Sequence, residues 1–180
     1  MSWGEIKAVL ILPGTVLVYV PAALLWARGA WPPAGPGEAL FWVALALALP
    51  ALGLMGWTMG LFHRFGDGTP APWDPTAKLV IRGPYRHMRN PMITGVLVFL
   101  LAEAAFFRSW DLLAWFAVFL AANAVYFPLV EEKGLARRFG ADYARYKDNV
   151  PRWLPRPTPW SPDDGPARGT ARFTGAASRR

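Results

Sequence analysis

One stretch of the sequence gathers side chains that can bind a polar ligand. It reads GPYRHMRNPMITG over residues 83–95 and combines Arg86, His87 and Arg89 with two glycines and two prolines. Arginine and histidine donate N–H groups to anionic oxygens, while glycine and proline constrain the backbone. A polar connection precedes the stretch and an uncharged apolar run follows it. We therefore expect it to hold a polar ligand beside a lipid-facing substrate.

A second set of candidates begins with two adjacent carboxylates, Glu131 and Glu132, which follow another apolar run. An acidic pair beside an arginine-rich loop can bind a zwitterion, with arginine holding its carboxylate and glutamate its ammonium. Aromatic faces can contact an adenine ring or a sulfonium cation. The candidate rings are those of Tyr85, Phe139, Tyr143 and Tyr146. A simpler interpretation is that the glutamates only pair with nearby arginines, Arg86 or Arg89.

Several other chemistries lack the residues they need. The chain has no cysteine, so it has no disulfide, thiolate metal site or cysteine nucleophile. Its two histidines, His63 and His87, do not have metal-ligand spacing, and we expect no metal site. No GxGxxG motif is present, which argues against a soluble dinucleotide-binding or Rossmann methyltransferase domain. A hydrolytic triad is unsupported.

The elements that position these candidates are apolar enough to cross a membrane. Apolar residues make up 54% of the chain and are concentrated in blocks. About 20 apolar residues in a helix span the hydrocarbon core. Because its apolar run is long and its start carries both charge signs, the first block fits a retained helix better than a cleaved signal peptide. The expected spans are residues 8–27, 39–62, 92–107 and 112–130.

Between and after the spans the chain is polar. Residues 63–90 form a long connection that we expect to be partly ordered. Residues 131–150 carry apolar side chains at three- and four-residue steps, which predicts an amphipathic helix on the membrane surface or over the loop. Residues 156–180 are rich in Pro, Gly, Ala, Ser and Arg, and we expect a disordered basic tail there. The predicted domain is residues 1–155.

Two features within the spans each allow two interpretations. Gly56 and Gly60 form a GxxxG pair, typical either of close helix packing or of ordinary membrane glycines. Glu103 is ionisable inside a span, which is a functional hypothesis in itself. Its position near the helix end also fits an interfacial carboxylate within reach of Arg108, and we favour that interpretation.

The distribution of positive charge predicts the orientation. Residues 63–90 and the stretch after Val130 are rich in lysine and arginine, whereas residues 28–38 and 108–111 hold one each. The positive-inside rule then places the long connection and both termini in the cytoplasm. The last two spans form a hairpin, so the 82–90 segment and the two glutamates should be neighbours. The +7 charge of so apolar a chain suggests anionic membrane lipids as partners and not nucleic acid.

The motifs resemble a known family of membrane enzymes. The pattern G-P-Y-R-x-x-R-N-P-M-x-x-G is followed by a hydrophobic hairpin and E-E-x-x-L-x-x-x-F-G-x-x-Y-x-x-Y-x-x-x-V-P. This order is similar to that of the isoprenylcysteine carboxyl methyltransferase and phospholipid methyltransferase superfamily, and the likeness covers residues 77–155. The likeness does not constrain the first two helices or the tail. Together with the four expected spans, it predicts an all-α integral membrane protein with four transmembrane helices. A helix 3–4 hairpin, a cytoplasmic loop and the amphipathic helix would enclose a cofactor site.

The resemblance also implies an activity and a set of residues. The protein would transfer a methyl group from S-adenosylmethionine, bound on the cytoplasmic side of the plasma (inner) membrane, to a lipophilic or small acceptor from the bilayer. Glu131 and Tyr85 are the catalytic candidates. The candidates for binding the cofactor are Lys78, Leu79, Val80, Tyr85, Arg89, Asn90, Pro91, Met92, Ile93, Glu131 and Tyr143.

Two positions depart from the family pattern, and two other functions stay open. Asn90 stands where many members have histidine, so imidazole chemistry is not expected there. Phe127 stands roughly where the prenylcysteine enzymes have an arginine for the substrate carboxylate, which argues against a methyl ester product. The alternatives are an NADPH-dependent membrane reductase of similar topology and a non-catalytic membrane protein that binds anionic lipids.

Overall fold

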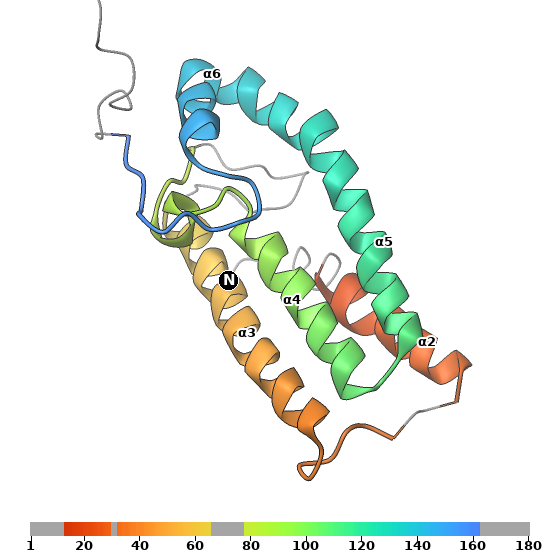
Figure 1. Cartoon of the computed structure of the whole chain (residues 1–180). Coiled ribbons are helices and arrows are strands. Elements are labelled where there is room, and N and C mark those ends of the chain that lie inside the picture. The colour runs from red at the N-terminus through yellow and green to blue at the C-terminus, as the bar shows by residue number, and fades with distance from the viewer. Residues whose placement is uncertain (1–12, 30–31, 66–77, 163–180) are drawn as a thin grey trace, which may run out of the picture.

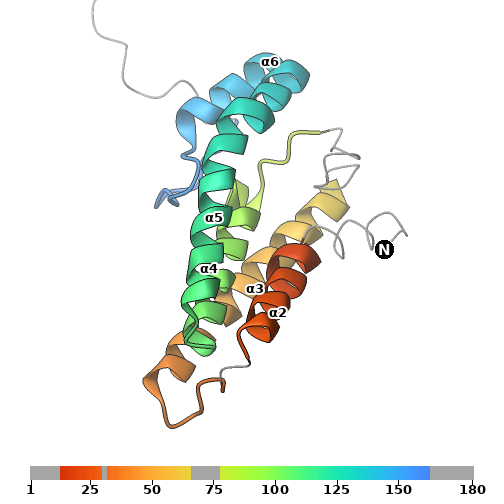
Figure 2. The ribbon, with the colours of Figure 1, turned by 90° about the vertical axis from the view of Figure 1, so that its right-hand side faces the viewer.

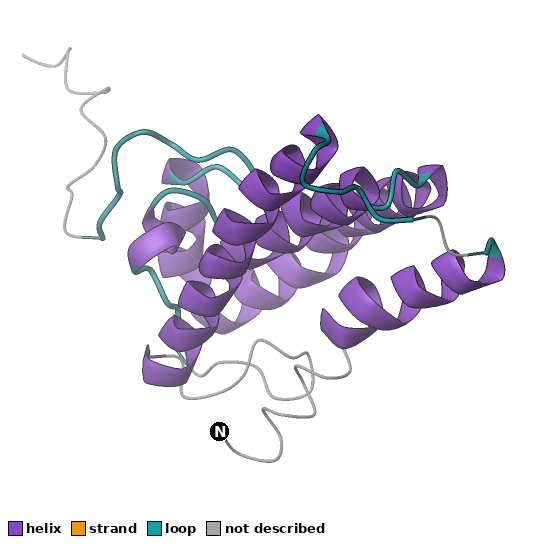
Figure 3. Cartoon of the chain, turned by 90° about the horizontal axis from the view of Figure 1, so that it is seen from below, coloured by secondary structure: helices purple, strands orange, loops and turns teal. Residues whose placement is uncertain are grey.

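The computed structural model describes residues 13–29, 32–65 and 78–162. Over these residues the chain is helical and contains no strand, which confirms the expected all-α class (Figure 3). The positions 8–12 of the first expected span, 66–77 of the connection and 163–180 of the tail lie outside the described residues. The elements are η1 (Thr15–Tyr19), α2 (Val20–Ala27), α3 (Ala39–Phe65), η2 (Gly83–Arg86), α4 (Pro91–Phe106), α5 (Trp110–Tyr126), η3 (Phe127–Glu131) and α6 (Glu132–Asn149).

The centre of the bundle is α4, which lies between α3 and α5 (Figures 1 and 2). Its Leu100 is 1% exposed, and Val96 and Leu97 are also buried. By contrast, α3 and α5 expose large apolar side chains on their outer faces, among them Trp57 and Val118. Exposed apolar surface on this scale marks a contact with membrane or another protein. The apolar outer faces therefore suit contact with lipid.

Two of the described helices are long and apolar enough to cross a membrane. They are Ala39–Phe65 and the continuous helix Trp110–Asn149, whereas the apolar helices Thr15–Ala27 and Pro91–Phe106 are shorter. Of the four predicted spans, two are thus supported by helices of sufficient length and apolar character. At about 1.5 Å per residue, a 40-residue helix is longer than the hydrocarbon core is thick. Only its uncharged part, residues 112–130, therefore belongs in the core.

Helix packing uses a different glycine from those in the GxxxG pair. Added Cβ atoms at Gly56 and Gly60 would meet no atom within 4 Å, so the pair takes no part in close packing among the described residues. A Cβ at Gly95 would lie 2.8 Å from the Met55 side chain and 3.2 Å from the Ala51 carbonyl oxygen. Gly95 is therefore the residue that lets α4 approach α3 closely.

The end of α5 continues into α6 without a loop. Pro128 lies in the π-helical turn η3, which joins the two helices. Proline lacks the N–H that an α-helix needs in its interior, and π turns accommodate such interruptions. The expected boundary at Val130 is thus not a break in the helix.

A break occurs instead at Gly140, whose φ of 51° and ψ of −124° are not helical. This backbone conformation is open to glycine and strained for other residues. The chain reverses there, so that the second half of α6 folds back toward the start of α4 (Figure 1). The single amphipathic helix expected over residues 131–150 is therefore two segments at an angle.

Candidate functional site

The first segment of the site is the turn η2, which glycine allows to lie against α3. Gly83 has a φ of +53°, and a Cβ on it would lie 3.0 Å from the Trp57 ring. Pro84 and Tyr85 follow and are buried. The Tyr146 hydroxyl donates a 2.7 Å hydrogen bond to the Tyr85 carbonyl oxygen. The turn is thereby attached to both α3 and α6.

The second segment begins α4. Asn90 precedes Pro91, the first helical residue, where a missing N–H costs nothing. The Asn90 carbonyl oxygen accepts hydrogen bonds from the backbone N–H and the hydroxyl of Thr94, both at 3.1 Å. Its own N–H donates to the Arg152 carbonyl oxygen. No side-chain cap forms at this helix start, so the hydrogen bonds of Asn90 described here are those of its backbone.

The third segment is the chain after α6, which runs beside residues 86–90. The N–H of Arg89 donates to Pro151 O, that of Arg156 to His87 O, and that of Trp160 to Arg86 O. Trp160 is 5% exposed and packs with Tyr143, Tyr146 and Val150. The described structure thus continues past residue 155, the predicted end of the membrane domain. Leu135 and Phe139, which complete the predicted apolar stripe, pack against the same cluster.

These segments meet at a buried ion-pair network centred on Glu132. Its side chain is 6% exposed. Oε1 accepts hydrogen bonds from Arg89 at 3.0 Å and from Arg152 at 2.6 Å, while Oε2 lies 3.0 Å from the Lys147 ammonium. Arg89 also donates to the Tyr143 hydroxyl at 3.3 Å. The network confirms that the segment before α4 and Glu132, at the start of α6, are neighbours.

The two adjacent glutamates have different environments. Burial raises the pKa of Glu132, but the hydrogen bonds from Arg152 and Lys147 and the charge of Arg89 outweigh it, so the pKa is lowered overall. Burial raises the pKa of Glu131, against a smaller opposing effect of Arg138. The pKa of Tyr85 is raised well above its usual value by burial first, then by Tyr146 and Glu131. Glu131 is thus close enough to Tyr85 to affect its pKa, and fewer positively charged side chains act on Glu131 than on Glu132.

The predicted site residues divide by location. Arg89 and Tyr143 belong to the Glu132 network, and Tyr85 lies buried with its ring 5.3 Å from that of Phe62. Val80 and Pro91 are buried, whereas Leu79, Asn90, Met92, Ile93 and Glu131 are half-buried and Lys78 is exposed. The sequence predicted that the acidic pair would bind a zwitterion or pair with arginines, and the family resemblance assigned the cofactor to Glu131 and gave no separate role to Glu132. Neither gave a role to Lys147, Arg152 or Trp160, because contacts made by a folded-back chain leave no periodic pattern.

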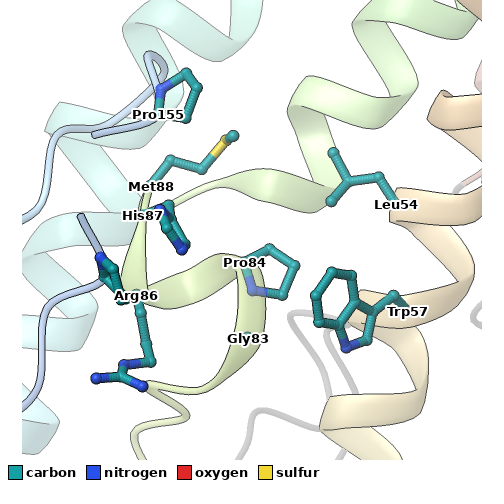
Figure 4. A pocket seen from close by; sticks show the side chains of 9 residues that line it. Leu54, Trp57, Gly83, Pro84, Arg86, His87, Met88 and Pro155 are labelled. Carbon is teal, nitrogen blue, oxygen red and sulfur yellow. The ribbon is translucent and has the colours of Figure 1, made fainter. Parts of the chain in front are cut away.

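One cavity in the described part of the chain lies beside these residues and not among them. It measures about 440 Å³ and is lined by Leu54 and Trp57 of α3, by Gly83, Pro84, Arg86, His87 and Met88, and by Pro155 and Pro159 (Figure 4). None of the predicted cofactor residues lines it. The η2 turn contributes Pro84 and Arg86 to the cavity, while Tyr85, between them, contacts Phe62 and α6.

The fold and site together define a helical membrane protein with a polar, cation-rich site at one end of its central helix. Comparison with known families matches residues 37–142 to the phospholipid methyltransferase family. This match covers more than half of the chain, and the protein belongs to that family. Among curated proteins, none matches the chain significantly.

The family match has different bounds from the motif-based resemblance. It begins before α3 and ends at residue 142, so it includes the first of the two long helices. The match stops before four buried residues that pack together as one hydrophobic cluster: Tyr143, Tyr146, Val150 and Trp160.

Proposed function

We propose that the protein transfers a methyl group from S-adenosylmethionine to a lipophilic acceptor delivered by the membrane. The observation that carries the proposal is the contact between Arg89 and Glu132, 3.0 Å apart, in a chain of the phospholipid methyltransferase family. That contact joins the segment before α4 to the start of α6. The donor would lie beside this contact, held by the residues that the resemblance implies.

The groups available at this place suit a zwitterionic donor. Arg89 Nε is buried and has no hydrogen-bond partner among the described residues. A buried N–H without a partner is costly, and a carboxylate oxygen would satisfy it. Glu131, next to the fully paired Glu132, would accept the donor's ammonium group. The residues therefore fit the amino acid part of S-adenosylmethionine.

When bound, S-adenosylmethionine supplies an electrophilic methyl group on a positively charged sulfur. Such a transfer depends mainly on proximity and alignment. The raised pKa of Tyr85 keeps its phenol protonated near neutral pH, so Tyr85 acts as an aromatic surface or hydrogen-bond donor and not as a base. The Glu132 network fixes Arg89 and Tyr143 and thus the walls of the site.

The acceptor is assigned to the cavity beside η2. Its volume falls within the range of about 300–1,000 Å³ typical of small-molecule sites. It is largely apolar, and one wall is Trp57, which is 58% exposed on the outer face of α3. A lipophilic molecule can therefore reach it from the bilayer. Following the positive-inside rule, we place this end of the bundle at the cytoplasmic face of the plasma membrane.

Donor binding tests the first part of the proposal. Calorimetry should show saturable binding of S-adenosylmethionine to the purified protein. Glu131→Gln should weaken it at least tenfold, whereas Asp142→Asn, the same change at an exposed position of α6, should leave it unchanged. Equal affinity in Glu131→Gln would remove that residue from the site. Binding of NADPH in place of S-adenosylmethionine would support the reductase alternative, and binding of neither would favour a non-catalytic lipid-binding protein.

Activity tests the second part. The protein is incubated with methyl-labelled donor and a membrane lipid extract, and the labelled product is identified by mass spectrometry. We expect label in a lipid-soluble product. Trp57→Glu, which places a charge in the apolar wall of the cavity, should reduce labelling while donor binding persists. Unchanged labelling in Trp57→Glu would separate the cavity from the acceptor.

A further inference from the structure

A second carboxylate, at the opposite end of α4, lies in an apolar groove without a counter-charge. Glu103 Oε2 is buried and has no hydrogen-bond partner among the described residues. Arg108, the partner expected from the sequence, is engaged elsewhere: its guanidinium Nη2 lies 3.1 Å from a Glu38 carboxylate oxygen. Arg108 is thus engaged away from Glu103, and the interfacial position of Glu103 near the end of α4 stays a prediction.

The groove is formed between α3 and α4 and has a volume of about 270 Å³. Apart from Glu103, every lining residue is apolar. Four of these are the phenylalanines Phe41, Phe99, Phe106 and Phe107, and small residues such as Ala44 and Ala102 form part of the wall. The groove is smaller than the range of about 300–1,000 Å³ for drug-sized ligands. It therefore suits a headgroup and the first part of a chain more than a whole lipid.

The chemistry of the groove favours one class of occupant. A buried carboxylate oxygen without a partner, such as Glu103 Oε2, is unfavourable, and a cation placed beside it would relieve that cost. Aromatic faces also attract ammonium groups, quaternary ones included. The apolar walls would contact the hydrocarbon attached to the cation. An anionic headgroup is disfavoured, because Glu103 would repel it.

We propose that the groove between α3 and α4 binds a membrane amphiphile through its ammonium group, with Glu103 as the counter-charge and the phenylalanine rings around it. The site is separate from the proposed methyl-transfer site. Glu103 lies about 18 Å along α4 from its first residue, at about 1.5 Å per residue. It is also within one turn of the last residue, Phe106, so a headgroup at the membrane surface can reach it. The inference does not depend on the proposed function.

Binding of a cationic probe tests the proposal. The purified protein in neutral detergent receives dodecyltrimethylammonium as a minor component, and bound molecules are counted by native mass spectrometry. Dodecanol and dodecanoate, of the same chain length, serve as neutral and anionic comparisons. We expect one saturable dodecyltrimethylammonium site and at least tenfold weaker binding of the two comparison compounds.

Two matched variants locate the site. Glu103→Gln keeps the shape of the side chain and should weaken dodecyltrimethylammonium binding at least tenfold. Glu38→Gln removes a carboxylate at the same end of the bundle but outside the groove, and should bind as the unaltered protein does. Circular dichroism and thermal unfolding confirm that both variants are folded. Equal binding by Glu103→Gln and the unaltered protein, or equal binding of dodecanol and dodecyltrimethylammonium, would overturn the proposal.

Discussion

A glutamate lies near each end of α4, and the two glutamates have opposite surroundings. Glu132 meets two arginines and a lysine within about 3 Å, whereas Glu103 Oε2 meets no hydrogen-bond partner among the described residues. The first carboxylate joins three segments of the chain that are distant in sequence. The second joins none. We infer that the Glu132 end is built for fixed geometry and that the Glu103 end is built to receive a charge from outside the chain.

The strongest test of this contrast removes the carboxylate of Glu132. Glu132→Gln leaves Arg89 buried and without its counter-charge, and breaking a buried ion pair in this way costs about 3–5 kcal/mol. Thermal unfolding in detergent should show the largest loss of stability among the variants considered. Lys147→Ala is the matched control, because the lysine is 49% exposed and its removal leaves Glu132 paired with Arg89 and Arg152, so a smaller loss is expected. Equal losses in the two variants would contradict a buried centre at Glu132.

The next largest loss of stability is expected at Gly140, where the chain turns back and brings the second half of α6 to the Glu132 network. Gly140→Ala forces a residue with a Cβ into a φ of 51° and a ψ of −124°, at a cost of about 1–3 kcal/mol. The added Cβ has no atom within 4 Å, so the cost comes from the backbone and not from a clash. Gly134→Ala, at a helical glycine that is also open, is the control. Thermal unfolding should show a loss for Gly140→Ala and none for Gly134→Ala.

Acid should weaken the Glu132 end selectively. The pKa of Glu132 is lowered in the folded chain from 4.5, so the unfolded chain takes up the proton first as pH falls. The stabilisation is complete above the ordinary pKa and is lost as pH falls through the lower, folded value. Midpoints of thermal unfolding measured from pH 6 to pH 3 should therefore decline more steeply for the unaltered protein than for Glu132→Gln. Parallel curves would show that the carboxylate does not carry the effect.

The smallest expected effect is at the other end of α4. Glu103→Gln removes a carboxylate that has no ion pair to lose, so thermal stability should stay within about 0.5 kcal/mol or rise. The same substitution at the two glutamates would thus give opposite results. A large loss in Glu103→Gln would reveal a structural role and remove the contrast between the two ends.

Periodicity and charge in the sequence predicted the helical class and the meeting of residues 82–90 with the two glutamates, because a helical hairpin brings those positions together. They did not reveal which glutamate forms the ion pairs, since Glu131 and Glu132 are neighbours and a π turn precedes them. They also missed the reversal at Gly140 and the return of residues 151–160 along residues 86–90. Those features depend on one backbone conformation and on hydrogen bonds between distant segments. The cofactor roles of the predicted site residues stay predictions.

The unbroken helix from α5 through η3 to the first half of α6 has a mechanical consequence. A stiff element with no loop between its membrane part and Glu131 passes any change of tilt directly to the glutamates. Helices adjust their tilt to bilayer thickness, and a change of about 10° over roughly 30 Å of helix moves its end by about 5 Å. The Glu132 network, which holds the same helix to Arg89 and Arg152, would resist that movement. Catalytic rate in this protein should depend on the thickness of the bilayer that surrounds it, and a series of nanodiscs with increasing acyl chain length would measure that dependence.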